Sequence, residues 1–282
     1  MKILILGSEG MLGYDLVRSL RRARHEAIGA GRADLDITDP EAADRFIKRI
    51  QPRLVVLTAA YTRVDDCESN RELAFAVNAE GPKNVASACR RVGARLYFLS
   101  TDYIFNGKKK TPYTENDPPE PVNVYGASKL AGEKNIQNLM QDYLILRTSW
   151  LYGSRGRNFV HTVLEKSQSV SELKVVDDQF GAPTSTQDLA AAIADLVDKE
   201  TGGILNVTNT GSCSWREFAQ KILELNGATG ATVRPISSKQ FNLPATRPAN
   251  SRLALDRFQR VMGYTLRPWQ QALADYLAQR RK

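Results

Sequence analysis

Histidine and cysteine are scarce in this chain. Its 282 residues include two histidines, His25 and His161, and three cysteines, Cys67, Cys89 and Cys213. An odd number of widely separated cysteines fits neither a disulfide framework nor a zinc site. The two histidines belong to no HExxH motif and no Ser-His-Asp arrangement. We therefore expect neither metal-based nor histidine-based catalysis, and we expect a reducing cytoplasm as the location.

Long apolar runs are absent as well. The sequence has no run of about 18 apolar residues, the length that a membrane-spanning helix needs. The short apolar run at residues 1–6 is followed by Gly7 and Glu9, and not by a small-residue cleavage site. We interpret this run as a buried strand and expect neither a membrane span nor a signal peptide.

Positive charge is in excess but dispersed. Lysine and arginine outnumber aspartate and glutamate by 39 to 31, for a net charge of +8, and cluster only at residues 108–110 and 280–282. Nucleic-acid binding usually needs a continuous basic patch with aromatic residues between the cations. We therefore expect no nucleic-acid partner, while small anionic ligands are compatible with the charge.

Short apolar runs alternate with amphipathic stretches through the first 150 residues. The predicted strands cover residues 2–6, 27–30, 54–59, 95–100 and 144–148. The predicted helices cover residues 11–24, 40–50, 71–92 and 125–141. Strands that are apolar on both faces belong in a parallel sheet covered by helices on each side. The sequence therefore predicts an α/β fold with a doubly wound, Rossmann-type parallel sheet.

Glycine and proline interrupt this pattern after residue 150. Further helices are predicted at 187–198, 214–225, 251–262 and 268–280, with a strand at 204–208 that rejoins the sheet. We expect residues 1–150 to form a dinucleotide-binding domain, rejoined by about 186–208. Residues 151–185 and 209–282 are expected to form a smaller, mainly helical substrate-binding lobe.

A glycine-rich turn follows the first predicted strand and opens the first helix. Gly7, Gly10 and Gly13 allow a tight turn, so that backbone near Met11 and Leu12 can approach a diphosphate at the positive end of the helix. Because a strand precedes the turn and a helix follows it, a dinucleotide site is a better interpretation than a plain loop.

The residues after the second strand bear on the choice of cofactor. An acid that binds the ribose hydroxyls of NAD is usual there, but this chain has Gly31 and Arg32. A guanidinium can pair with a 2'-phosphate, which favours NADPH. Asp34 or Asp36 could instead bind a ribose. Ile37, which follows Asp36, belongs to the same candidate cofactor-binding segment. NADH is therefore the alternative cofactor.

Tyr125 and Lys129 are four residues apart on a predicted helix. Residues at this spacing share one helix face, and an ammonium there favours the phenolate, so Tyr125 could exchange a proton. Thr101 ends the fourth strand and is expected at the same sheet edge. Taken alone, a Tyr-Lys pair at this spacing is usually a coincidence.

Small residues end the third strand, where they would let backbone approach a cofactor. The candidate contacts are Ala59, Ala60, Tyr61 and Thr62. Together with the glycine turn and Thr101, they make the pair of Tyr125 and Lys129 a candidate catalytic site.

These motifs, in this order, resemble the extended short-chain dehydrogenase/reductase superfamily. Longer stretches narrow the resemblance to its dTDP-4-dehydrorhamnose reductase family, at residues 100–107, 123–133, 147–153, 178–184 and 247–251. The resemblance implies NAD(P)H-dependent reduction of the C4 ketone of dTDP-4-dehydro-L-rhamnose to dTDP-L-rhamnose. Such a product serves the synthesis of cell-envelope polysaccharides.

The same resemblance implies roles for single residues. Tyr125 would protonate the developing alkoxide, Thr101 would hydrogen-bond the same oxygen, and Lys129 would hold the nicotinamide ribose and lower the pKa of the tyrosine. Arg247 and Asn250 match positions suggested to meet the nucleotide diphosphate. The candidate substrate-binding residues are Thr101, Asp102, Tyr103, Trp150, Arg247 and Asn250.

Some members of the family are thought to dimerise around a magnesium ion held by acidic side chains. Asp15 and Asp188 are shorter candidates in this chain, and the short C-terminus offers no clear partner. We therefore expect no essential Mg²⁺, and either a monomer or a homodimer.

Two alternatives stay open. Other nucleotide-sugar 4-ketoreductases and epimerases share the glycine motif and the Tyr-x-x-x-Lys pattern, whereas dehydratases typically carry an acid where this chain has Tyr103. A non-catalytic, NADP-binding regulatory subunit similar to the β subunit of methionine adenosyltransferase is the second alternative. Such a subunit need not keep Thr101, Tyr125 and Lys129, all of which are present here.

Overall fold

The computed structural model describes residues 1–228 and 230–280. The last two residues of the basic C-terminal cluster, Arg281 and Lys282, lie outside this part of the chain. Six parallel strands form the central sheet in the order β10-β5-β4-β3-β1-β2. Their bounds are β1 Lys2–Leu6, β2 Glu26–Ala30, β3 Leu54–Leu57, β4 Arg95–Thr101, β5 Tyr143–Thr148 and β10 Gly203–Asn206. The predicted fold class is confirmed.

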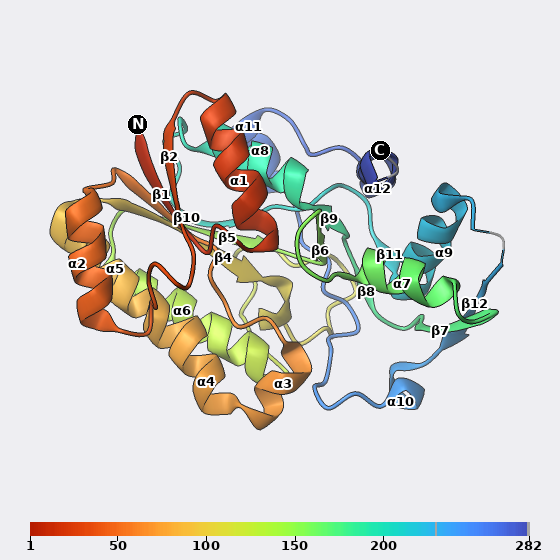
Figure 1. The fold of residues 1–282 in the computed structure, drawn as a ribbon. Coiled ribbons are helices and arrows are strands. Elements are labelled where there is room, and N and C mark those ends of the chain that lie inside the picture. The colour runs from red at the N-terminus through yellow and green to blue at the C-terminus, as the bar shows by residue number, and fades with distance from the viewer. Residues whose placement is uncertain (229, 281–282) are drawn as a thin grey trace.

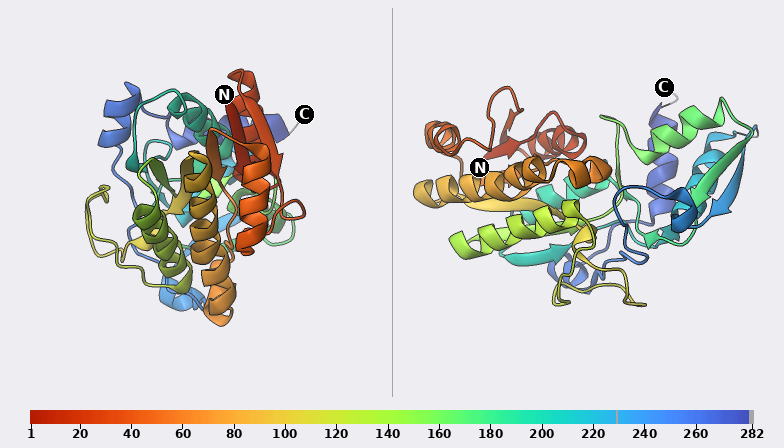
Figure 2. Two further views of the ribbon diagram at one scale, coloured as in Figure 1. Left: turned by 90° about the vertical axis from the view of Figure 1, so that its left-hand side faces the viewer. Right: turned by 90° about the horizontal axis from the view of Figure 1, so that it is seen from below.

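Helices cover both faces of the sheet (Figure 1; Figure 2 shows the layers from two further sides). One face carries α1 Met11–Arg22, α8 Thr186–Leu196 and α11 Asp256–Met262. The other carries α2 Pro40–Ile50, α5 Gly81–Val92 and α6 Val124–Leu139. Strand order reverses between β1 and β3, since the chain first adds β2 on one side of β1 and then returns to the other. Ligands of open α/β sheets bind at such a point, beyond the carboxyl ends of the strands.

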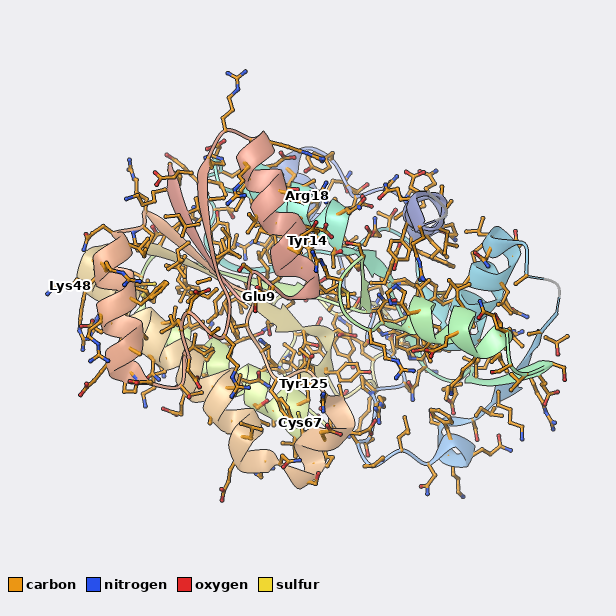
Figure 3. All side chains as sticks on the ribbon, viewed as in Figure 1. Glu9, Tyr14, Arg18, Lys48, Cys67 and Tyr125 are labelled. Atoms are coloured by element: carbon orange, nitrogen blue, oxygen red, sulfur yellow. The ribbon has the colours of Figure 1, made fainter. Side chains whose placement is uncertain are left out.

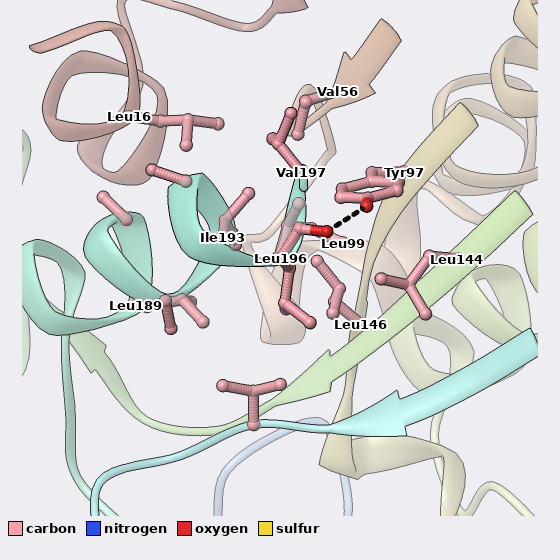
Figure 4. Close-up of a cluster of buried hydrophobic side chains, with 14 of the residues drawn as sticks. Leu16, Val56, Tyr97, Leu99, Leu144, Leu146, Leu189, Ile193, Leu196 and Val197 are labelled. Atoms are coloured by element: carbon pink, nitrogen blue, oxygen red, sulfur yellow. Dashed lines mark hydrogen bonds between the residues drawn. The ribbon is translucent and has the colours of Figure 1, made fainter. Parts of the chain in front are cut away.

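The apolar runs of the strands are explained by the two covered faces. In β1, Ile3 and Ile5 pack under α1 and α8, whereas Leu4 and Leu6 pack under α2 and α5. Figure 4 shows the first of these cores, in which the Tyr97 hydroxyl donates a hydrogen bond of 2.9 Å to the carbonyl of Leu196. Alternate residues on both faces of β1, β3, β4 and β5 are therefore buried, which holds the carboxyl edge of the sheet rigid.

A smaller lobe lies to the right of the sheet in Figure 1. Its core is an aromatic and aliphatic cluster that includes Phe218, Trp269 and Tyr276. Its longer elements are α7 Phe159–Ser167, β7 Glu172–Val176, α9 Trp215–Asn226, β12 Thr232–Ile236, α10 Ser238–Phe241 and α12 Trp269–Arg280. Short strands β6 Leu151–Tyr152, β8 Phe180–Gly181, β9 Thr184–Ser185 and β11 Cys213–Ser214 connect them in pairs, β6 with β9 and β8 with β11.

Several elements differ from the sequence prediction. The single helix predicted at 71–92 is α4 Arg71–Phe75, a π-helix Ala76–Glu80 and α5, and an unpredicted α3 Val64–Ser69 precedes it. The helix predicted from residue 251 starts at Asp256. Helix α7 and strands β7 and β12 were also not predicted. Strand β12 contains Pro235 and is largely exposed, so its sequence has neither the apolar run nor the free N–H groups of a central strand.

Candidate active site

A cavity of about 710 Å³ opens at the carboxyl ends of the strands, between the sheet and the smaller lobe. Most of the predicted site residues line it together. They are Gly7, Gly10, Met11, Leu12, Arg32, Asp36, Ile37, Ala59, Ala60, Tyr61, Thr62, Thr101, Asp102, Tyr103, Tyr125, Lys129 and Trp150. The strand-end, glycine-turn and helix motifs thus meet in one hollow, although they are spread over the first 150 residues.

The glycine turn between β1 and α1 leaves no room for a Cβ atom at Gly7 or Gly13. Gly7 has a φ of 89°, and a Cβ there would lie 2.6 Å from the backbone N of Ala59. A Cβ on Gly13 would lie 2.2 Å from the carbonyl oxygen of Gly7, so this glycine lets α1 pack directly on the turn. Gly13 does not line the cavity, whereas Gly7, Gly10 and Ala59 do. The bare backbone and the N-terminus of α1 form a cradle that fits a diphosphate.

Arg32 and Asp36 lie at the end of the cavity formed by the residues after β2. Asp36 accepts hydrogen bonds from the backbone N and the hydroxyl of Thr38, at 2.9 and 2.7 Å. These bonds, with a smaller contribution from Arg32, lower the pKa of the Asp36 carboxyl. Because Asp36 is already engaged by its own loop and Arg32 is exposed, this end of the cavity favours an anionic group over a neutral ribose.

The start of α6 orients Tyr125. The Asn123 side chain caps the helix by accepting a hydrogen bond of 2.7 Å from the N–H of Gly126. The Glu68 carboxylate accepts a hydrogen bond of 2.9 Å from the N–H of Val124. A Cβ on Gly126 would lie 2.1 Å from the carbonyl oxygen of Tyr103, so glycine there lets the 3₁₀ turn Asp102–Ile104, which follows β4, pack against the helix. Tyr125 is labelled in Figure 3 on α6, across from Glu9 in the glycine turn.

The phenol of Tyr125 is held among other site residues. Burial raises its pKa, while a hydrogen bond with the Thr101 side chain acts in the opposite direction. The ring meets Tyr103 edge-on, with 5.9 Å between ring centroids and 77° between the planes. Tyr125 therefore keeps its proton at neutral pH in this arrangement, as a general acid must.

Lys129 is almost fully buried below Tyr125. Its ammonium donates a hydrogen bond of 2.6 Å to the carbonyl of Leu99 and lies 4.0 Å from the centroid of the Phe98 ring. Burial lowers the pKa of Lys129 to about 7, although Glu133 raises it. Burial, and not Lys129, dominates the pKa of Tyr125, so the expected tuning of the tyrosine by the lysine stays a prediction.

Asp102 contributes a buried carboxyl to the cavity. One oxygen accepts a hydrogen bond of 3.1 Å from the Thr101 hydroxyl, and the Ser251 side chain is a further hydrogen-bonding neighbour of the carboxyl. Burial raises the pKa of Asp102 to about 7.

Sequence reasoning missed Asn78, which lies in the π-helix. The oxygen of its side chain accepts a hydrogen bond of 2.8 Å from the N–H of Tyr61. Its side-chain nitrogen donates hydrogen bonds to the Tyr61 carbonyl at 2.9 Å and to the Ser128 hydroxyl at 3.0 Å. Asn78 thereby ties the cofactor-facing loop after β3 to the residue before Lys129. Pro82, at the start of α5, was the signal in the sequence that the helix predicted at 71–92 is interrupted, because a proline inside a helical pattern marks a break.

Three lobe residues that sequence reasoning also missed line the cavity, namely Arg157, Asn158 and Trp215. They come from the glycine-containing loop before α7 and from the first turn of α9. The lobe therefore contributes basic, polar and aromatic side chains to the same hollow.

Arg247 and Asn250 lie outside the lining of this cavity. Arg247 pairs with both carboxylate oxygens of Asp65 at 2.6 Å and also hydrogen-bonds Tyr103. The Asn250 side chain donates to the carbonyls of Lys109 and Thr111, at 2.5 and 3.1 Å. Their contact with a nucleotide diphosphate stays a prediction.

Residues 1–228 and 230–280 contain no group of three or more histidine, cysteine or acidic side chains that could hold a metal ion. Asp15 accepts a hydrogen bond of 2.6 Å from Thr186, and Asp188 pairs with Arg267 at 2.9 Å. Within the same described residues, no helix has the length and apolar character to cross a membrane.

Comparison with known proteins gives one consistent family. The model of the RmlD substrate binding domain matches residues 1–282. A dTDP-4-dehydrorhamnose reductase of Streptomyces griseus is 42% identical over 278 residues, which cover 96% of this chain and 91% of that protein. A probable dTDP-4,6-dihydroxy-2-methyloxan-3-one 4-ketoreductase of Streptomyces antibioticus is 41% identical, with coverage of 98% and 94%.

A solved structure extends the similarity to three dimensions. The dTDP-4-dehydrorhamnose reductase of Bacillus anthracis, solved in complex with NADP, superposes with a TM-score of 0.95 and 38% sequence identity. The match covers 99% of this chain and 100% of that one. The similarity therefore includes both the sheet and the lobe.

Proposed function

The chain belongs to the RmlD substrate-binding family, and from this premise we propose that it reduces dTDP-4-dehydro-L-rhamnose to dTDP-L-rhamnose with NADPH. The observation that carries the proposal is the single cavity that unites the glycine turn with Thr101, Tyr125 and Lys129. A regulatory subunit has no need to combine a dinucleotide cradle with a proton donor in this way.

The cofactor site is supported by the residues at one end of the cavity. Gly7 and Gly13 give a cradle that any Cβ would fill, and Arg32 offers a cation for a 2'-phosphate. Bound there, NADPH would supply the hydride that reduces the ketone carbon. The ammonium of Lys129 is the donor available to a ribose hydroxyl, since it already lies at the cavity wall with a carbonyl as its partner.

Tyr125 is the proposed proton donor to the ketone oxygen. Its O–H bond breaks as the carbonyl oxygen gains negative charge, which leaves a phenolate that takes a new proton from solvent. Burial raises the pKa of Tyr125, so the phenol is protonated before the reaction. The Thr101 hydroxyl, whose one proton is donated to Asp102 in this structure, would turn from Asp102 to donate to the same oxygen as its charge develops.

The sugar is proposed to lie between Asp102 and the aromatic residues of the cavity. The carboxyl of Asp102, a residue that lines the cavity, would accept a hydrogen bond from a sugar hydroxyl, while Tyr103 and Trp150 present apolar surface to a deoxysugar. The lobe residues would then select the nucleotide sugar, while the sheet edge performs the chemistry.

The test is NADPH oxidation by the purified chain with dTDP-4-dehydro-L-rhamnose, with its GDP-linked counterpart as the comparison. We expect turnover with the dTDP-sugar and little with the GDP-sugar. Absence of any ketone-dependent oxidation, together with co-purification of a synthetase, would favour the regulatory subunit. Release of a 4-keto-6-deoxy product from dTDP-glucose without net cofactor oxidation would identify a dehydratase instead.

A second candidate is reduction of a different dTDP-linked 4-ketosugar. It is favoured by the similarity to the Streptomyces antibioticus 4-ketoreductase, which is nearly as high as that to the Streptomyces griseus enzyme. The two activities share all steps at Thr101, Tyr125 and Lys129 and differ only in the sugar that the pocket accepts. Product stereochemistry, read by NMR, separates them.

We place this reaction in the cytoplasm. Cys67, Cys89 and Cys213 are free and buried, which supports a reducing compartment. A nucleotide-sugar and NADPH are both small anionic ligands, in agreement with the net charge of +8.

A further inference from the structure

Trp150 has an unfavourable backbone conformation. Its φ is 47°, in the left-handed region, which is unfavourable for a bulky residue and persists only where the surroundings enforce it. Trp150 lies two residues beyond the end of β5 and lines the same cavity as Thr101 and Tyr125. The position of its indole must therefore be set by other residues.

The first of these residues is Trp215. The two indole rings are stacked, with 3.5 Å between ring centroids and 7° between the planes. Trp215 also lines the cavity, and Phe159 packs on it with 4.6 Å between centroids. Stacked aromatic pairs contribute beyond the area that they bury, so the pair favours one orientation of Trp150.

Trp215 is itself fixed by the start of α9. It is the first residue of this helix, directly after the N-cap Ser214. Ser214 and Glu217 form a reciprocal capping box, and the Ser214 hydroxyl donates to Asp177 at 2.5 Å. The helix start is thus anchored twice, which leaves Trp215 little freedom to follow a displaced Trp150.

The second residue is Gly181, which lies against the Trp150 indole. A Cβ on Gly181 would be 2.4 Å from Cε2 of Trp150, although the backbone of Gly181 is not in the left-handed region. Alanine at this position is therefore free of backbone strain but collides with the indole. Gly181 pairs with Cys213 in the β8–β11 ladder, so one short ladder brings both Gly181 and Trp215 to Trp150.

We propose that Trp215 and Gly181 are positioning residues, which hold the Trp150 indole in place as the wall of the cavity that contacts the sugar. The inference rests on the proposed function for the identity of the sugar. Trp150 comes from the chain that follows the sheet, whereas its two supports come from the lobe. The lobe would thereby set the affinity for the sugar without contact with the reacting atoms.

Loss of either support should therefore change KM for the ketosugar without a matching change in KM for NADPH. A displaced indole loses contact with the sugar, while Tyr125, Lys129 and the cofactor cradle keep their geometry. KM for the ketosugar should rise, kcat should change less, and KM for NADPH should stay constant. General damage to the fold would instead affect both substrates.

The experiment compares Trp215→Ala, Trp215→Phe and Gly181→Ala with a matched control, Gly230→Ala. A Cβ on Gly230 meets nothing within 4 Å, and its φ is not in the left-handed region. We expect Trp215→Ala and Gly181→Ala to raise KM for dTDP-4-dehydro-L-rhamnose about tenfold and to leave KM for NADPH within about twofold. Trp215→Phe should restore most of the loss, and the control should match the wild type. An unchanged sugar KM, or an equal rise in both KM values, overturns the inference.

A spectroscopic measurement separates failure of this inference from failure of the proposed function. Stacked indoles couple in the far-ultraviolet circular dichroism spectrum, and the coupled signal needs both rings. It should disappear in Trp150→Phe and in Trp215→Phe, and persist in Trp269→Phe. If the wild type reduces no ketosugar but shows this signal, the proposed function fails while the stack stands. If the wild type is active but the signal is absent or survives Trp215→Phe, the positioning role fails.

Discussion

Replacing Tyr125 by phenylalanine removes one hydroxyl and leaves the ring that packs against Tyr103 and lines the cavity. The structural effect is the loss of one hydrogen bond with Thr101, which is worth about 1 kcal/mol of stability. The catalytic effect is larger. A positioned general acid contributes about 10²–10⁴ in rate, or roughly 3–5 kcal/mol of barrier. The two effects are therefore separable by size.

The assay is the ketosugar-dependent loss of NADPH absorbance, with NADPH affinity measured in parallel by fluorescence titration. We expect Tyr125→Phe to lower kcat by about a thousandfold and to bind NADPH as the wild type does. Tyr97→Phe is the matched control, because it also removes one buried hydroxyl, whose partner Leu196 lies in the core away from the cavity (Figure 4). A rate near that of the wild type in Tyr125→Phe, or an equal loss in Tyr97→Phe, would refute the assigned role.

Three further changes test the charges of the site. Arg32→Ala should raise KM for NADPH about 10- to 100-fold and leave KM for NADH nearly constant, because a charge-assisted pair with the 2'-phosphate is lost; equal changes for both cofactors would contradict this contact. The pKa of Asp102 is raised by burial from 3.8 to about 7, so the native state binds a proton that the unfolded chain releases between these values. The free energy of unfolding should then fall by on the order of 2–4 kcal/mol as pH rises through this window, and urea titrations should show no such fall in Asp102→Asn. The pKa of Lys129 is lowered by burial from 10.5 to about 7, so here the unfolded chain binds the extra proton. The free energy of unfolding should rise with pH between about 7 and 10.5, a rise that Lys129→Met should lose along with activity.

The sheet could be predicted because the sequences of its strands themselves indicate that the strands are buried. Ile3 and Ile5 enter one core while Leu4 and Leu6 enter the other, so an unbroken apolar run signals a strand covered on both faces. The ribbon of β7 and β12 carries no such signal. Its strands pair with each other at the edge of the lobe, and their exposed residues and Pro235 resemble loop sequence.

The proposed catalytic pair could be picked out for a related reason, since the spacing of Tyr125 and Lys129 is local to one helix. Asn78 was not predictable in the same way. A helical pattern runs through residues 71–92, and the π-turn within it exists because Asn78 bonds Tyr61 and Ser128, which are distant in sequence. Tertiary hydrogen bonds therefore overrode local helix geometry at a position next to the site, where π-helical turns often occur.

Arg247 was singled out in the sequence, but its partner in the structure was not. Its guanidinium engages Asp65, 182 residues away, and Ala245 donates to the same carboxylate at 3.1 Å. The side chain of Asn123, the N-cap of α6, donates a hydrogen bond of 2.7 Å to the carbonyl of Thr246. Residues 245–247 thus join the lobe to α3 and to the start of α6, next to Tyr125. A diphosphate bound by the two terminal nitrogens of Arg247 would compete with Asp65, so the proposed nucleotide contact would be linked to the position of α3.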